Sequence, residues 1–134
     1  MLQTYNVNNQ VADSASTATA MFCGVKTKYY MVGLDAIAPF NSCDAEVNQR
    51  AKVSSMMSWA QDNGKDTGIV TTTRVTHATP AATYAHTNNR DWECDGEIPQ
   101  QDVNCVKDIA RQLVEDAPGN KFKVRIVCER LTKF

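Results

Sequence analysis

The chain has 134 residues, of which 43% are hydrophobic and 22% are charged, and its formal net charge is −1. This composition is typical of one soluble globular domain that is large enough to bury a core. Charges of both signs are interspersed without a basic cluster, so we expect no nucleic-acid binding. No apolar run approaches the roughly 20 residues that a bilayer-spanning helix needs, and residues 1–4 lack the features of a signal peptide. We therefore expect the chain to begin either in the cytosol or in the middle of a larger protein.

The first half of the chain shows patterns for two helices and one strand. Near Ser14, the small residues of the run QVADSASTATA favour either the opening of a helix or a tightly packed turn. Residues 28–34 are rich in aromatic and branched side chains and predict a short strand. Asp44 is a suitable N-cap for a second helix that runs to about Asp62, where Asn63 and Gly64 would end it.

The middle of the chain begins with its strongest strand pattern. Almost every residue of 68–75 is β-branched, and such residues favour strands. Pro80 can open a helix from Ala81 to about His86. A polar loop over residues 87–101 then separates this helix from the last part of the chain.

The last part predicts one helix and one strand. Apolar residues at helical spacing indicate a helix over residues 102–115, and after a turn at 118–120 the apolar side chains of 122–128 alternate as in a strand. The succession of strands and helices predicts an α/β sheet. In such sheets functional groups gather where strands end and helices begin, and Ser14, Thr79 and Arg90 fall at such places.

The cysteines form an odd set without a metal-binding pattern. None belongs to a CxxC pair, so a zinc finger is poorly supported. A bridge between Cys43 and Cys105 is possible, but spacing alone does not decide it. The five positions are Cys23, Cys43, Cys94, Cys105 and Cys128.

Ser14 has two interpretations. A serine before a helix is ordinarily a capping residue, but it can also be a nucleophile, provided that a base or a metal ion activates its hydroxyl. The segment His77-Ala78-Thr79 offers nitrogen and oxygen atoms that could lie near a metal, although a hydrogen-bonded loop is the commoner use. His86 is ordinarily a packed or surface residue, and Arg90 is ordinarily an exposed loop charge.

Three stretches taken together are much more specific than any one of these residues. They read TYNVNNQVADSASTATAMFCGVK, GIVTTTRVTHATPAATYAHTNNRDW and CVKDIARQL. In order and spacing they resemble the metazoan alkaline phosphatases over nearly all of residues 1–124, and they look most like the arthropod members. The resemblance implies that residues 1–134 are part of one larger catalytic domain, a three-layer α/β sandwich with a central, mostly parallel sheet.

The resemblance also implies a role for each candidate site residue. Ser14 matches the serine that is phosphorylated and that approaches one of two zinc ions. Arg90 matches the arginine that binds phosphate, and Asp13 matches the carboxylate that steadies it. Thr79 matches a hydroxyl ligand of the single magnesium ion, and His77 matches a position beside the direct ligands of that ion.

Further properties come from the resemblance alone. It implies a disulfide between Cys43 and Cys105 and a buried free thiol at Cys23, whereas Cys94 and Cys128 have no implied partner. A disulfide suits an extracellular or secretory setting. The family further implies a phosphate monoester substrate, a homodimer, and attachment to the cell surface through a GPI lipid anchor.

The resemblance has two departures. The family's metal-bridging aspartate would precede Met1, and its other zinc and magnesium ligands would lie far beyond Phe134, so we expect residues 1–134 alone to lack activity. Residues 125–129 also replace the family's apolar pair and Gly-Gly-Gly-Arg turn, a change that a local frame shift would produce.

Two other hypotheses compete with a phosphatase fragment. The first is a catalytically dead α/β module that binds or supports other molecules, and the second is an unrelated cytosolic α/β domain in which Ser14 only caps a helix. Zinc content together with phosphomonoester hydrolysis would distinguish a working enzyme from the dead module, which predicts neither.

Overall fold

The first helix begins at a side chain that can cap it. The computed structural model describes residues 4–127, and α1 (Ser14–Cys23) follows Asp13, which is its N-cap. Gly24 ends α1 with a φ of 72°, a left-handed conformation that glycine adopts without steric cost. Of the two alternatives for this run, a helix opening or a packed turn, the structure has the helix, in which Ser14 is the first residue and Asp13 is the cap.

The single helix expected over residues 44–62 is wrong, because the chain forms two helices there. They are α2 (Ala45–Ala51) and α3 (Met56–Asp62). Lys52 has an extended backbone, with φ −59° and ψ 129°, and it forms an isolated antiparallel bridge with Leu34. This pairing with a distant segment interrupts the helical pattern.

The strand expected over residues 28–34 is also wrong. Val32 forms only an isolated antiparallel bridge with Thr87. The backbone of Tyr30 has a φ of 67° and that of Gly33 a φ of 62°. Left-handed residues cannot continue an extended strand, so the segment bends twice where the side-chain pattern predicted a straight element.

The sheet consists of two short parallel strands in the described residues. Strand β1 (Gly68–Thr71) pairs with β2 (Val124–Val127), and Gly68 lies opposite Val124. Both strands lie inside the expected ranges, but β1 ends earlier because the chain turns after Thr71. Cys128, the last residue of the expected final strand, lies outside the described residues.

The helices between the two strands start at other residues than expected. Helix α4 (Ala78–Ala81) includes Pro80 in its first turn, where no backbone N–H is required. Helix α5 (Ile109–Glu115) starts after Asp108, and residues 102–105 form turns in place of its expected first half. Two short 3₁₀ helices are η1 (Asp95–Glu97) and η2 (Gly119–Lys121), the second at the expected turn.

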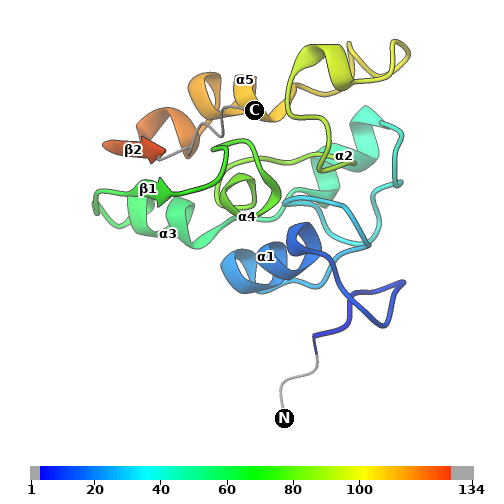
Figure 1. The fold of residues 1–134 in the computed structure, drawn as a ribbon, viewed down its shortest axis with the longest axis horizontal. Coiled ribbons are helices and arrows are strands. Elements are labelled where there is room, and N and C mark those ends of the chain that lie inside the picture. The colour runs from blue at the N-terminus through cyan, green and yellow to red at the C-terminus, as the bar shows by residue number, and fades with distance from the viewer. Residues whose placement is uncertain (1–3, 128–134) are drawn as a thin grey trace, which may run out of the picture.

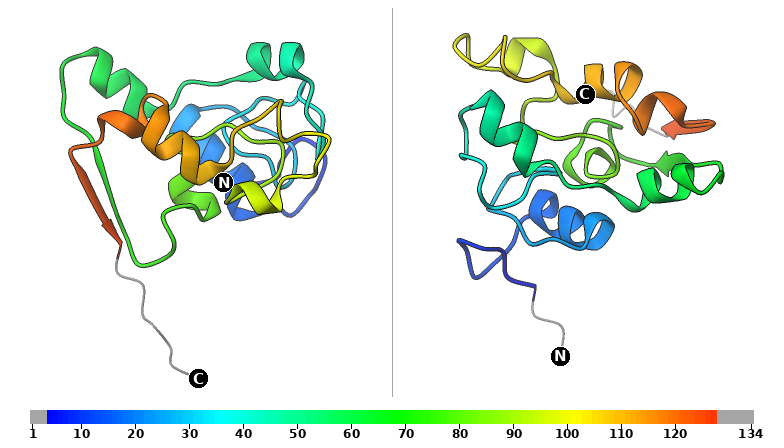
Figure 2. Two further views of the ribbon diagram at one scale, coloured as in Figure 1. Left: turned by 90° about the horizontal axis from the view of Figure 1, so that it is seen from above. Right: turned by 180° about the vertical axis from the view of Figure 1, so that it is seen from behind.

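Helix α4 lies at the centre of the molecule, between α1 and α5 (Figure 1). The sheet and α2 lie toward opposite ends of the long axis (Figures 1 and 2). The main core brings together small and large apolar residues of all three central helices, including Ala15, Ala18, Ala78, Ala81, Ile109 and Leu113. Small residues on α1 and α4 let these helices approach closely, so the start of α1 is held against the segment that precedes α4.

Candidate active site

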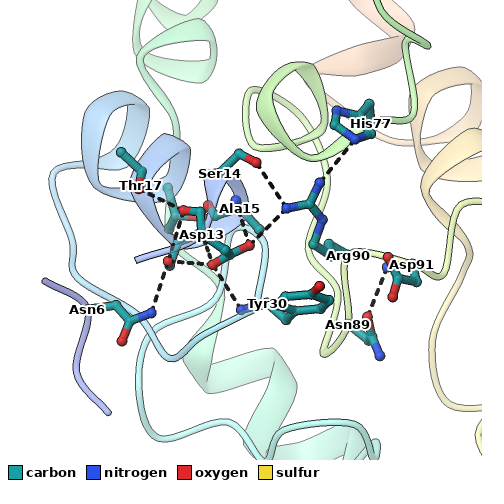
Figure 3. A network of polar contacts seen from close by, with 12 residues as sticks. Asn6, Asp13, Ser14, Ala15, Thr17, Tyr30, His77, Asn89, Arg90 and Asp91 are labelled. Atoms are coloured by element: carbon teal, nitrogen blue, oxygen red, sulfur yellow. Dashed lines mark hydrogen bonds and ion pairs between the residues drawn. The ribbon is translucent and has the colours of Figure 1, made fainter. Parts of the chain in front are cut away.

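Asp13 holds a buried, charged carboxylate at the start of α1 (Figure 3). Its Oδ1 accepts hydrogen bonds from the Ser16 hydroxyl at 2.6 Å and from the Tyr30 backbone N–H at 3.0 Å, and its Oδ2 accepts from the Ala15 N–H at 2.9 Å. Burial raises the pKa of Asp13, but these bonds and one from the Ser16 N–H outweigh burial, so the pKa lies below its ordinary value of 3.8. The carboxylate is therefore charged at neutral pH.

Arg90 reaches the same place from a distant loop (Figure 3). Its Nη1 donates to Oδ2 of Asp13 at 3.2 Å and to Oγ of Ser14 at 2.9 Å. The ion pair is shielded from solvent, since the side chains of Asp13 and Arg90 are only 5% and 14% exposed. Within residues 4–127, the Nε–H and one N–H of Nη2 have no hydrogen-bond partner, so the guanidinium keeps donors for a ligand with two acceptor oxygens.

His77 completes the contacts of Arg90. Its Nε2 lies 3.0 Å from Nη2 of Arg90, and because a guanidinium can only donate, the histidine nitrogen must accept. Burial lowers the pKa of His77 below 6.5, and the positive charges of Arg90 and Arg74 lower it further. His77 is therefore neutral, with its proton on Nδ1.

The Ser14 hydroxyl is exposed to solvent and accepts its hydrogen bond from Arg90. No side chain among the described residues accepts a hydrogen bond from it. The backbone N–H groups of Ala15 and Ser16 at the start of α1 are already bound by the carboxylate of Asp13. The arrangement positions the serine oxygen beside a cation but does not by itself remove the serine proton.

Thr79 lies apart from these contacts. It is exposed in α4 and lines a shallow pocket of about 220 Å³ beside Ile69 and Val70 of β1. Its hydroxyl makes no hydrogen bond within the part of the chain that the structure describes. The structure thus brings together Asp13, Ser14, His77 and Arg90 in one network of contacts, and the Thr79 hydroxyl is not part of that network.

The described residues do not fit a complete metal centre. Among residues 4–127, no three His, Cys, Asp or Glu side chains are grouped so that they could hold a metal ion. Ser14 and Thr79 offer one hydroxyl each, which falls short of the three or more protein ligands that a zinc site uses.

The expected disulfide between Cys43 and Cys105 is confirmed. Cys23 is a buried free thiol, also as expected, and burial raises its pKa to about 11. Cys94 is free and exposed.

The loop that carries Arg90 is anchored by buried amides that sequence reasoning did not single out. Asn88 is completely buried, and it exchanges hydrogen bonds of 2.6 and 2.9 Å with Asn48. Asn88 also donates to the carbonyl of Pro39 at 2.8 Å. No sequence signal distinguishes these asparagines from loop residues, since each gains its partner only through the fold.

Tyr30 is another residue of the site that the sequence did not reveal. Its backbone contacts both Asp13 and Arg90, and its ring lies beside the guanidinium of Arg90 (Figure 3). Its aromatic neighbours suggested a strand, and a tyrosine with positive φ has no sequence signature.

The fold and these contacts define an α/β protein in which a serine at the start of a helix accepts a hydrogen bond from an arginine of a distant loop. The chain matches the family model for alkaline phosphatase over residues 1–127. It is 58% identical over 124 residues to Alkaline phosphatase 4 of Drosophila melanogaster, covering 92% of this chain and 20% of that protein. It is 50% identical over 126 residues to the Membrane-bound alkaline phosphatase of Bombyx mori, covering 92% and 23%. The chain therefore belongs to the alkaline phosphatase family.

Solved structures agree with this assignment. The alkaline phosphatase of the Antarctic bacterium TAB5 is 37% identical, with a TM-score of 0.55 over 66% of this chain and 22% of that one. A cold-active alkaline phosphatase from Shewanella sp. is 28% identical, with a TM-score of 0.57 over 76% and 24%. A variant of the TAB5 enzyme is described with Mg bound in its M3 site. These similarities confirm the expected α/β fold class.

The chain spans about a fifth of the length of the curated relatives that it matches. No helix in residues 4–127 is long and apolar enough to cross a membrane.

Proposed function

We propose that the protein carrying these residues hydrolyses phosphate monoesters through a phosphoserine formed at Ser14. The observation that supports the proposal best is the placement of Arg90, which contacts both Asp13 and Ser14 in a chain of the alkaline phosphatase family. In this proposal Ser14 is the nucleophile, Arg90 binds the phosphoryl group, and Asp13 holds Arg90 in place.

Each residue has a physical reason for its proposed role. The two free N–H donors of Arg90 suit two phosphoryl oxygens, a bidentate contact that lysine cannot make. Arg90 is restrained by Asp13, so less side-chain freedom is lost when phosphate binds. Ser14 lies at the positive end of the α1 dipole, which favours the negative charge of a phosphoryl group.

The family also supports metal cofactors, and we propose two zinc ions and one magnesium ion for the whole protein. Bound metal would lower the pKa of the serine hydroxyl. Such activation is needed because no base among the described residues accepts the serine proton. Ser14 would contribute to zinc binding and Thr79 to magnesium binding, with His77 beside the magnesium ligands. Because the described residues hold no complete ligand set, we expect residues 1–134 alone to be inactive, and the remaining ligands would come from other parts of the protein.

The proposed setting is the cell surface. The disulfide between Cys43 and Cys105 suits an oxidising compartment, and one relative is named a membrane-bound alkaline phosphatase. A lipid anchor and a homodimer are part of the same proposal, as is a phosphate monoester substrate without nucleic-acid binding.

A serine substitution in the full-length protein tests the proposal. Ser14→Ala should abolish the acid-stable phosphoenzyme that radiolabelled phosphate forms, and it should lower turnover of p-nitrophenyl phosphate by a factor on the order of 1,000 or more. The matched control is Ser54→Ala, which changes an exposed serine outside the candidate site and should leave both readouts intact. A phosphoenzyme that persists in the Ser14→Ala variant would remove Ser14 from the role of nucleophile.

A further inference from the structure

Tyr30 joins the two halves of the candidate site (Figure 3). Its backbone N–H donates to Oδ1 of Asp13 at 3.0 Å, and its backbone carbonyl accepts from the N–H of Arg90 at 2.8 Å. Its ring centroid lies 5.3 Å from Cζ of Arg90. One residue therefore contacts the carboxylate, the main chain of the arginine and the guanidinium.

The backbone of Tyr30 is unusual for an aromatic residue. Its φ is 67°, in the left-handed region that bulky side chains rarely occupy. Such a conformation persists where the surrounding contacts hold it. Here Tyr30 makes hydrogen bonds to both Asp13 and Arg90, and these contacts help to hold that conformation.

The ring adds a contact that the backbone cannot provide. The face of an aromatic ring is electrically negative and attracts a guanidinium within about 6 Å. Asp13 and His77 bind Arg90 at Nη1 and Nη2, whereas the ring approaches the guanidinium at Cζ. A group held in this way keeps its free Nε–H and Nη2 N–H in one orientation.

On the basis of the proposed function, we infer that Tyr30 is a positioning residue that orients Arg90 for phosphate. Its backbone sets the separation of Asp13 and Arg90, and its ring restricts rotation of the guanidinium. Tyr30 touches Arg90 and acts on phosphate only through it.

Three substitutions separate the ring from the backbone. Tyr30→Phe keeps the ring, Tyr30→Ala removes it and keeps the strained conformation, and Tyr30→Gly removes it and relieves the strain while keeping the N–H and carbonyl. The control is Tyr5→Ala, which removes another aromatic–cation contact, that of Tyr5 with Lys26 at 3.3 Å, from outside the site.

The first readout is NMR of the Arg90 side chain in the full-length protein, which does not depend on activity. The ring current of Tyr30 should shift the Arg90 δ-methylene and Nε–H resonances, and this shift should persist in Tyr30→Phe and Tyr5→Ala. It should disappear in Tyr30→Ala and Tyr30→Gly. Unchanged Arg90 resonances in both truncations, in samples whose circular dichroism shows folded protein, would overturn the inference.

The second readout is the inhibition constant of inorganic phosphate for the full-length, metal-loaded protein. Tyr30→Ala and Tyr30→Gly should raise this inhibition constant about 3- to 30-fold, the range that a partly desolvated cation–π contact implies. Tyr30→Phe, which keeps the ring, should have the wild-type inhibition constant. In an Arg90→Ala background, Tyr30→Ala should add nothing. Loss of affinity in Tyr30→Phe, or an equal loss without Arg90, would contradict positioning through the ring.

The two proposals can fail separately. A Ser14→Ala variant that keeps its phosphoenzyme rejects the proposed nucleophile and leaves the NMR test of Tyr30 intact. A Tyr30→Ala variant with wild-type Arg90 resonances and phosphate affinity rejects the positioning role and leaves Ser14 as the proposed nucleophile.

Discussion

Replacing Asp13 with alanine should destabilise this chain far more than the loss of an ordinary helix cap. The change removes the N-cap of α1, the acceptor for the partly buried Tyr30 N–H and the countercharge of Arg90. An N-cap contributes about 1 kcal/mol, an unsatisfied buried donor costs about 1–3 kcal/mol, and breaking a buried ion pair costs about 3–5 kcal/mol. These costs overlap, because Arg90 keeps Ser14 and His77, so we expect a loss of about 3–5 kcal/mol in the free energy of unfolding.

Urea unfolding followed by circular dichroism measures this loss, and Asp44 provides the matched control. Asp44 caps α2 through the N–H groups of Glu46 and Val47 at 3.1 and 3.0 Å, but it is exposed. Asp44→Ala should therefore cost only about 1 kcal/mol. Equal losses for Asp13→Ala and Asp44→Ala would refute the reasoning that burial and the pairing with Arg90 make Asp13 special.

The same comparison has a pH dependence with a definite sign. The pKa of Asp13 lies below 3.8 in the folded chain, because its hydrogen bonds outweigh the effect of burial. Its charge therefore contributes stability above pH 3.8, and this contribution is lost as the pH falls through the folded pKa. The difference between wild type and Asp13→Ala should shrink when unfolding is measured below pH 3.8.

Three further predictions concern the scaffold. Gly33→Ala should lower the free energy of unfolding in urea by about 3 kcal/mol or more, because φ is 62° and a Cβ would clash with a backbone carbonyl oxygen. The control Gly24→Ala, with φ 72° and open space around the residue, should lower it by about 1–2 kcal/mol. Replacing both Cys43 and Cys105 by serine should lower the free energy of unfolding by about 4 kcal/mol, because the disulfide closes a loop of 62 residues. An unchanged Tm of the double variant would contradict this prediction. Burial lowers the pKa of His86 below 6.5, so its neutral form stabilises the fold above pH 6.5 and stability should fall as pH drops below that value. Melting curves between pH 7.5 and 5 of wild type and His86→Gln should show a smaller decrease in the variant.

Local signals in the sequence narrowed the start of α1 to a helix opening or a packed turn, with Ser14 as the candidate cap. The small residues after Asp13 favour a helix that packs closely, and the acidic residue supplies the cap that α1 uses. The strand at residues 68–71 was also evident, because its β-branched residues act locally. The propensity for a strand was visible locally, although its partner β2 lies far along the chain.

Other elements depend on distant partners, and there local patterns failed. Lys52 leaves the helical path because it pairs with Leu34, and the first half of the helix expected from residue 102 is replaced by turns beside the disulfide. The contact of Asp13 with Arg90 joins residues 77 positions apart, and only the family resemblance brought them together before the structure did. Tyr30 has a positive φ and is hydrogen-bonded to both residues, and neither feature has a local signature in the sequence.

The parallel pairing of β1 with β2 also bears on the order in which the chain folds. Parallel strands cannot be joined by a tight turn, so the ladder closes only after the intervening segment, with α4 and α5, has found its place. Contacts between distant residues form late because closing a long loop costs chain entropy. The caps of Asp13 and Asp44 bond N–H groups two or three residues away and can form early, whereas we expect the sheet that links residues 68–71 to 124–127 to form late.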